Sequence, residues 1–155
     1  MLFRSCYCAA NNLLRTFMDK LSSAYGFVVI DNEAGMEHLS RRTTNNVDLL
    51  CIVAEATALG VVTAKRIFEL AKQLPISVKE IGVIWNRAES SKQLDGIEVF
   101  GYVPYDQAVL DASMQGKTIF DLETNSPAFL SVRKILEKKL NLSSFSSTQS
   151  SKLET

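Results

Sequence analysis

The chain has 155 residues, of which 46% are hydrophobic and 22% are charged, with 17 basic and 17 acidic side chains. This composition is typical of one globular domain and argues against an intrinsically disordered chain, while zero formal charge gives no general attraction to nucleic acid or an anionic membrane. No apolar run could span a bilayer, and three cysteines make no disulfide framework, so we expect a cytoplasmic protein with reduced thiols.

Apolar periodicity predicts alternating helices and strands along the chain. The first helix is indicated by apolar residues three and four positions apart, namely Ala10, Leu13, Leu14, Phe17, Met18 and Leu21. Unalternating apolar runs, which are typical of strands buried on both faces of a parallel sheet, then occur at 27–30, 49–54, 81–85 and 98–103. Further helices are expected at 64–74, around 107–115 and at 129–140.

This alternation predicts an α/β fold with a mainly parallel sheet flanked by helices. Functional groups in such sheets gather at the carboxyl ends of the strands. The residues at those ends are Asp31, Glu55, Asn86 and the pair Pro104-Tyr105. We therefore look for the functional site among them.

Asp31 and Gly35 form the first candidate site, directly after the run at 27–30. A carboxylate at this place can hold a magnesium ion beside a triphosphate, and a glycine lets a backbone N–H approach the terminal phosphate. The alternative is structural, with Asp31 ending a strand and Gly35 making a turn.

Four segments together resemble the CooC-type ATPases: 6–14, which begins Cys-Tyr-Cys, 31–41, which reads Asp-Asn-Glu-Ala-Gly-Met-Glu-His-Leu-Ser-Arg, 85–87 and 103–106. CooC proteins mature the nickel site of carbon monoxide dehydrogenase and share one P-loop class with MinD and the nitrogenase iron protein. The resemblance runs from residue 6 to about residue 140 and implies the latter part of a MinD-like fold. It also implies ATP and magnesium as cofactors, a homodimer, and carbon monoxide dehydrogenase as the client.

The chain departs from this family in one respect, because no Lys-Gly-Gly-x-Gly-Lys-Thr phosphate loop precedes Cys6. Gly116-Lys117-Thr118 imitates the end of such a loop, but Asp111 stands where the motif needs glycine. We therefore expect a non-native or disordered start at 1–5, a partial P-loop ATPase domain at 6–141 and a disordered Ser-rich tail at 142–155. Residues 2–5 match a translated sequencing adapter, which would explain the start.

Asn86, Arg87, Pro104 and Tyr105 are the nucleotide-binding candidates. Asn86-Arg87 resembles the position at which this class reads adenine, and an Asn amide supplies both a donor and an acceptor. Pro104-Tyr105 resembles the segment that closes the other side of the base pocket. The alternatives are that Asn86 is a turn residue and Tyr105 is core packing.

Cys6 and Cys8 are the metal-binding candidates. Two thiolates can share one soft ion, but zinc or nickel needs about four ligands, so each chain supplies half a site and a two-fold dimer completes it. The alternative is a pair of unremarkable reduced thiols.

The function implied by the resemblance is ATP-dependent insertion of nickel into carbon monoxide dehydrogenase. Because the phosphate loop is missing, we expect this chain alone neither to hydrolyse ATP nor to bind it tightly. Two alternatives are a MinD-like positioning ATPase and a non-enzymatic metal-binding or interaction module.

Overall fold

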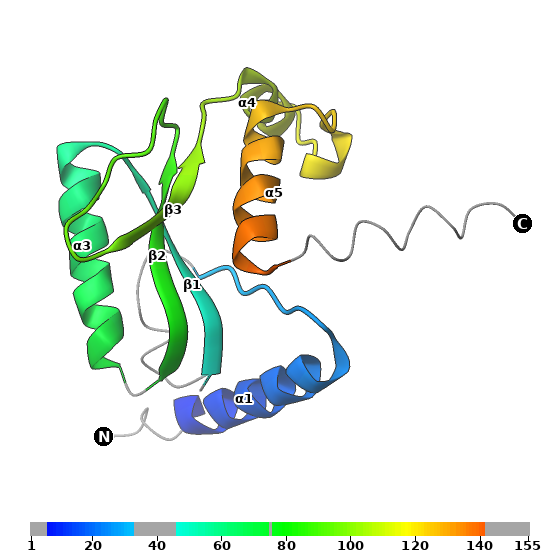
Figure 1. Ribbon diagram of the computed structural model, residues 1–155. Coiled ribbons are helices and arrows are strands. Elements are labelled where there is room, and N and C mark those ends of the chain that lie inside the picture. The colour runs from blue at the N-terminus through cyan, green and yellow to red at the C-terminus, as the bar shows by residue number, and fades with distance from the viewer. Residues whose placement is uncertain (1–5, 33–45, 75, 142–155) are drawn as a thin grey trace, which may run out of the picture. The chain divides into compact units, whose positions relative to one another are not determined.

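The computed structural model describes residues 6–32, 46–74 and 76–141. In chain order (Figure 1), the elements are α1 (Cys6–Ala24), β1 (Asn46–Glu55), α3 (Ala58–Gln73), β2 (Ser77–Asn86), β3 (Glu98–Val103), α4 (Gln107–Met114), the 3-10 turn η1 (Ile119–Asp121) and α5 (Pro127–Lys139). The chain divides into two compact units. The first unit is Met1–Leu50 with Lys65–Ile81, and the second unit is Cys51–Ala64 with Gly82–Thr155.

The described strands form one sheet in the order β1-β2-β3. β2 and β3 pair in parallel, from Gly82 opposite Glu98 to Asn86 opposite Val103. Two ion pairs connect β1 with β2. Asp48 near the start of β1 pairs with Lys79 near the start of β2 at 2.6 Å, and Glu55 at the end of β1 pairs with Arg87, directly after the end of β2, at 3.6 Å. β1 therefore runs in the same direction as β2, and the predicted α/β fold with a parallel sheet is confirmed.

The centre of β2 holds the largest fully buried side chains among the described residues. The side chains of Val83 and Trp85 are fully buried, and the Trp85 indole N–H donates to the carbonyl of Lys92 at 2.6 Å. The pairing register shifts by one residue after Val83, so Phe100 bulges out of the β3 ladder. A Cβ on Gly82 would lie 2.5 Å from the Phe100 ring, so the glycine makes room for this bulge.

Helix α3 begins at a threonine cap and buries one face. The hydroxyl of Thr57 accepts a hydrogen bond from the backbone N–H of Gly60 at 3.0 Å, which satisfies a donor in the first turn. A Cβ on Gly60 would clash with the carbonyl oxygen of Glu55, so only glycine allows the helix to start so close to β1. Ala64, Phe68 and Ala71 are buried at intervals of four and three residues, the spacing of a helix face.

Helix α5 packs against β3 in the second unit (Figure 1). Ile135 is its buried residue and lies so close to Gly101 that a Cβ there would meet it at 2.8 Å. At the end of the helix, Lys139 forms an ion pair with Glu98 at 2.5 Å and lies 4.2 Å from the centroid of the Phe100 ring. A cation in the last turn also complements the helix dipole.

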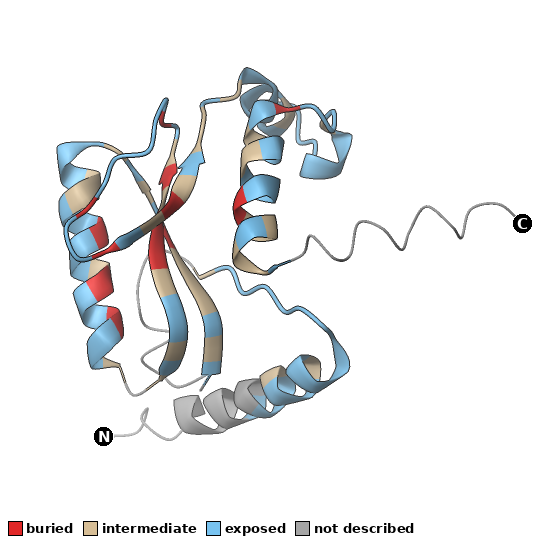
Figure 2. Cartoon of the chain, in the orientation of Figure 1, coloured by how far each residue is buried: buried red, intermediate tan, exposed pale blue. Residues whose placement is uncertain are grey.

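The strand predicted at 27–30 is wrong. These residues take no part in the described sheet and all four side chains are exposed, Val29 to 92% (Figure 2). A strand needs a neighbour that pairs its N–H and C=O groups, and no described strand supplies one here. Residues 1–5 and 142–155, for which disorder was expected, lie outside the described residues. No helix within the described ranges is long and apolar enough to cross a membrane.

Candidate functional site

The carboxyl ends of β2 and β3 bring four of the predicted site residues together in the second unit. Asn86 is the last residue of β2 and lies opposite Val103, the last residue of β3, so Arg87 and Pro104 leave neighbouring strands side by side. The backbone N–H of Ala88 donates to the carbonyl of Val103 at 3.1 Å and holds the two strand ends together. Asn86, Arg87, Pro104 and Tyr105 therefore lie at one edge of the sheet, as parallel strands require.

Arg87 has an uncommon backbone conformation, with φ at 51°. Few residues other than glycine adopt positive φ, and asparagine-type side chains often stabilise such turns. Here the side-chain oxygen of Asn86 accepts a hydrogen bond from the Arg87 N–H at 3.1 Å. The Arg87 guanidinium reaches the carboxylate of Glu55 at the end of β1, at 3.6 Å, with both side chains more than half exposed. The turn interpretation of Asn86 is compatible with a binding role, because the turn uses the side-chain oxygen and the amide N–H donors take no part in it.

Tyr105 is 55% exposed, so the interpretation of this residue as core packing is wrong. Its hydroxyl donates to the side-chain oxygen of Gln107 at 2.7 Å, and the Gln107 amide donates to Asp111 at 2.7 Å. These two hydrogen bonds fix the ring against the first turn of α4. An exposed, oriented aromatic ring beside a strand end can form one wall of a pocket for a flat ligand.

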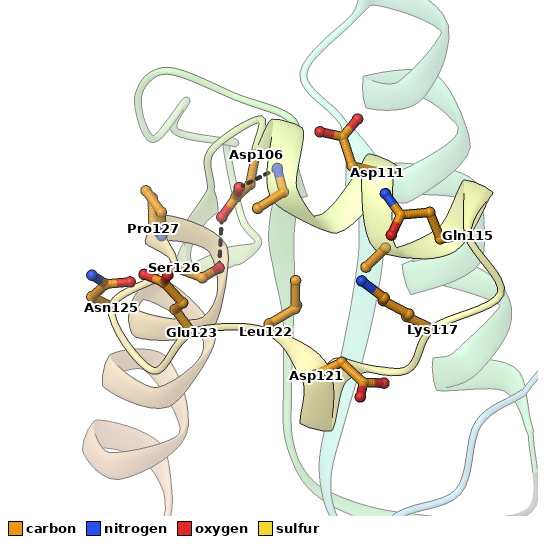
Figure 3. Close-up of a pocket in the computed structure, with 12 residues that line it drawn as sticks. Asp106, Asp111, Gln115, Lys117, Asp121, Leu122, Glu123, Asn125, Ser126 and Pro127 are labelled. Carbon is orange, nitrogen blue, oxygen red and sulfur yellow. Dashed lines mark hydrogen bonds between the residues drawn. The ribbon is translucent and has the colours of Figure 1, made fainter.

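Asp106 fixes the backbone that follows Tyr105 by capping two helices at once (Figure 3). Its carboxylate accepts from Ala108 N–H at 3.0 Å in α4, and from the Ser126 hydroxyl at 2.6 Å and Ala128 N–H at 3.2 Å at the start of α5. The Ser126 hydroxyl and the Ala128 amide hold the pKa of this carboxyl below its usual value. No sequence pattern predicts the Asp106–Ser126 contact, because the two residues are 20 positions apart and a capping pattern involves residues of one helix only.

An open pocket of about 330 Å³ lies beside this double cap, between α4, η1 and the start of α5 (Figure 3). Its carboxylates include Asp106 and Asp121, and both accept hydrogen bonds that cap a helix or turn. Within the described ranges no group of three or more His, Cys, Asp or Glu side chains is placed to hold a metal ion. Asp106 and Asp121 are therefore accounted for by local structure, as is Asp111, which accepts a hydrogen bond from the Gln107 amide.

Gly116-Lys117-Thr118 forms the turn after α4 and not a phosphate loop. Gly116 has φ at 67°, and Thr118 caps η1 in a capping box with Asp121. The segment therefore has a structural role as the turn between α4 and η1.

The remaining predicted site residues are not brought to this edge by any described contact. Asp31 is exposed and belongs to the first unit, and its magnesium role stays a prediction. Gly35 lies outside the described residues, as does most of the segment 31–41.

Cys6 and Cys8 fall in the first turn of α1, and their side chains lie outside the described residues. The metal-binding role of this pair therefore stays a prediction. The third cysteine, Cys51, is half-buried in β1, and burial raises the pKa of its thiol, partly offset by the charge of Lys139.

Comparisons with known proteins agree with this architecture. No protein-family model matches the chain. The solved structure of a ParA family ATPase from Chlorobium tepidum superposes with a TM-score of 0.62 over 85% of this chain and 57% of that one, at 19% identity. The fold is therefore that of the ParA and MinD class of P-loop ATPases.

Sequence comparison shows which members of this class of ATPases the chain resembles. An uncharacterized ATP-binding protein of Methanocaldococcus jannaschii is 39% identical over 145 residues, which are 88% of this chain and 57% of the relative. The carbon monoxide dehydrogenase accessory protein CooC of Rhodospirillum rubrum is 35% identical over 135 residues, 79% of this chain and 48% of CooC. The chain is a homologue of the CooC/MinD-like P-loop ATPases, and it spans about half the length of the curated relatives it matches.

Proposed function

We propose that this chain carries the base-binding side of an adenine nucleotide site in a CooC-like ATPase. The observation that supports this most directly is the meeting of Asn86, Arg87, Pro104 and Tyr105 at one sheet edge. Asn86 offers amide donors and a remaining acceptor lone pair, the pattern that pairs with an adenine edge. Tyr105 offers an exposed ring held in place by Gln107.

The phosphates and magnesium need groups that this edge does not supply. The chain contains no G-x-x-x-x-G-K-[ST] sequence, and phosphoryl transfer depends on a phosphate cradle, its lysine and magnesium. Asp31 is the proposed magnesium carboxylate and Gly35 the proposed contact to the terminal phosphate. We therefore expect the 155-residue chain to bind the nucleoside weakly and to show no ATP turnover.

The proposed role of the whole protein is ATP-dependent nickel insertion into carbon monoxide dehydrogenase, supported by 35% identity to CooC. In this proposal nickel is cargo, carried between two chains by Cys6 and Cys8, and zinc can stand in for it. Four thiolates from a two-fold dimer match the ligand number of a tetrahedral soft-metal site.

A chimera tests this function. Residues 6–141 replace the matching segment of Rhodospirillum rubrum CooC, so that the phosphate loop comes from CooC. The chimera is assayed for ATP turnover and for nickel-dependent activation of apo carbon monoxide dehydrogenase. We expect both activities, and loss of turnover in the chimera with Asp31→Ala. Turnover without activation of the dehydrogenase would contradict the nickel role and favour a positioning ATPase, and a folded chimera without turnover would contradict both.

A further inference from the structure

Glu55 and Arg87 form an ion pair that links the ends of β1 and β2 at the candidate nucleotide site. We propose that Glu55 is a positioning residue for adenine, because its carboxylate holds the Arg87 guanidinium beside the base that Asn86 reads. This inference rests on the proposed nucleotide site. No motif in the sequence assigns a role to Glu55.

The backbone around Arg87 is already fixed, so its side chain is the part that needs an anchor. The Asn86 side chain binds the Arg87 N–H at 3.1 Å, and the following N–H, of Ala88, binds Val103 at 3.1 Å. A positive φ of 51° at a non-glycine residue costs energy, and such residues concentrate at functional sites. Among the described residues, the contact that orients the guanidinium is its ion pair with Glu55, at 3.6 Å.

The charges of this pair decide which part of a nucleotide it contacts. A phosphate attracts an uncompensated cation, whereas Glu55 neutralises Arg87 and would repel phosphate at close range. A guanidinium is planar, is weakly hydrated and stacks on aromatic rings. Arg87 is 61% exposed on its side chain and so is open to a ligand. The pair therefore suits the base and ribose of the nucleotide and not its phosphates.

The chain offers a matched control pair on the same two strands. Asp48 and Lys79 join the starts of β1 and β2 at 2.6 Å, with side chains 80% and 76% exposed. This pair has the same chemistry and links the same strands, but it lies in the first unit and away from the strand ends that carry Asn86. Asp48→Asn therefore removes an equivalent ion pair without touching the site.

The experiment titrates adenosine into the 15N-labelled chain and follows backbone amides by NMR. We expect shifts at Asn86, Arg87 and Ala88. Glu55→Gln should weaken adenosine binding about three- to fivefold, the upper part of the range that an exposed ion pair contributes, and should lower the Tm no more than Asp48→Asn does. Asp48→Asn should leave the Kd unchanged. In an Arg87→Ala background, Glu55→Gln should have no further effect, because Glu55 acts through Arg87.

Two results would overturn the inference while leaving the nucleotide site standing. One is an equal Kd for the wild type and Glu55→Gln, and the other is a full additional loss from Glu55→Gln in the Arg87→Ala background. Failure of adenosine to shift the Asn86–Ala88 amides in the wild type would overturn the proposed site and this inference together. The adenosine probe separates these cases because it needs no phosphate cradle.

Discussion

Replacing Ser126 by alanine should destabilise the chain by about 1 to 2 kcal/mol, the cost of losing a helix cap. The Ser126 side chain is 4% exposed and makes two hydrogen bonds at this point. Its oxygen accepts from the Phe129 N–H at 3.3 Å, and its hydroxyl donates to Asp106 at 2.6 Å. We expect the upper half of the range because both bonds are lost in a part-buried place, where water replaces them poorly.

The assay is urea unfolding followed by circular dichroism, with the free energy of unfolding taken by linear extrapolation. Thr118→Ala is the matched control, because Thr118 caps the exposed three-residue turn η1 and makes no contact with Asp106. We expect it to cost about 0.5 kcal/mol, the low end of the range for losing a cap, because the turn is short and exposed. Ser126→Thr keeps the hydroxyl and should recover part of the loss. The reasoning is refuted if Ser126→Ala costs no more than Thr118→Ala.

Three further predictions concern pH, packing and metal. Hydrogen bonds from Ser126 and Ala128 lower the pKa of Asp106. The ionised carboxylate therefore stabilises the folded chain at pH values above about 4, the pKa of an Asp in the unfolded chain. This stabilisation is lost as the pH falls through the lower pKa of the folded state. Asp106→Asn should therefore have a lower Tm than the wild type at pH 7, and this gap should close in acid; a gap independent of pH would contradict the assignment. Gly82→Ala should cost about 1 to 3 kcal/mol in urea unfolding because its Cβ would meet the Phe100 ring at 2.5 Å, whereas Gly26→Ala, with nothing within 4 Å, should be neutral. Zinc should bind at one ion per two chains, and it should bind less tightly as the pH falls. Elemental analysis together with the mass of the protein in solution measures this stoichiometry, and Cys6→Ser or Cys8→Ser should each abolish zinc binding. One ion per monomer with no change in mass would contradict the prediction.

The elements with strong periodicity could be predicted from the sequence. β3 was expected at 98–103 and is observed at Glu98–Val103, and α5 was expected at 129–140 and is observed at Pro127–Lys139. The end of α3 was predicted to within one residue, but the helix begins at Ala58, six residues before the expected start. These segments bury an apolar face or run whose spacing appears directly in the residues. The run at 27–30 has the same composition but forms no strand, because strand formation also depends on a partner that composition does not reveal.

The candidate site was predictable only in part, for a similar reason. Asn86, Arg87, Pro104 and Tyr105 could be named because each follows an apolar run, and parallel strands place such residues at one edge. The Glu55–Arg87 ion pair joins residues 32 positions apart, and no local pattern shows which exposed side chains will meet. The positive φ of Arg87 could not be predicted either, since arginine has no turn preference of its own.

The most direct test of the central claim is photolabelling of the chain with 8-azidoadenosine, followed by peptide mapping. The account predicts adducts within 86–88 or at Pro104 and Tyr105, suppressed by excess adenosine and reduced by Asn86→Ala. Guanosine should compete less well, because an adenine edge and a guanine edge present different donors and acceptors to the Asn86 amide. Adducts confined to other parts of the chain, or labelling that excess adenosine does not suppress, would contradict an adenine site at the carboxyl ends of β2 and β3.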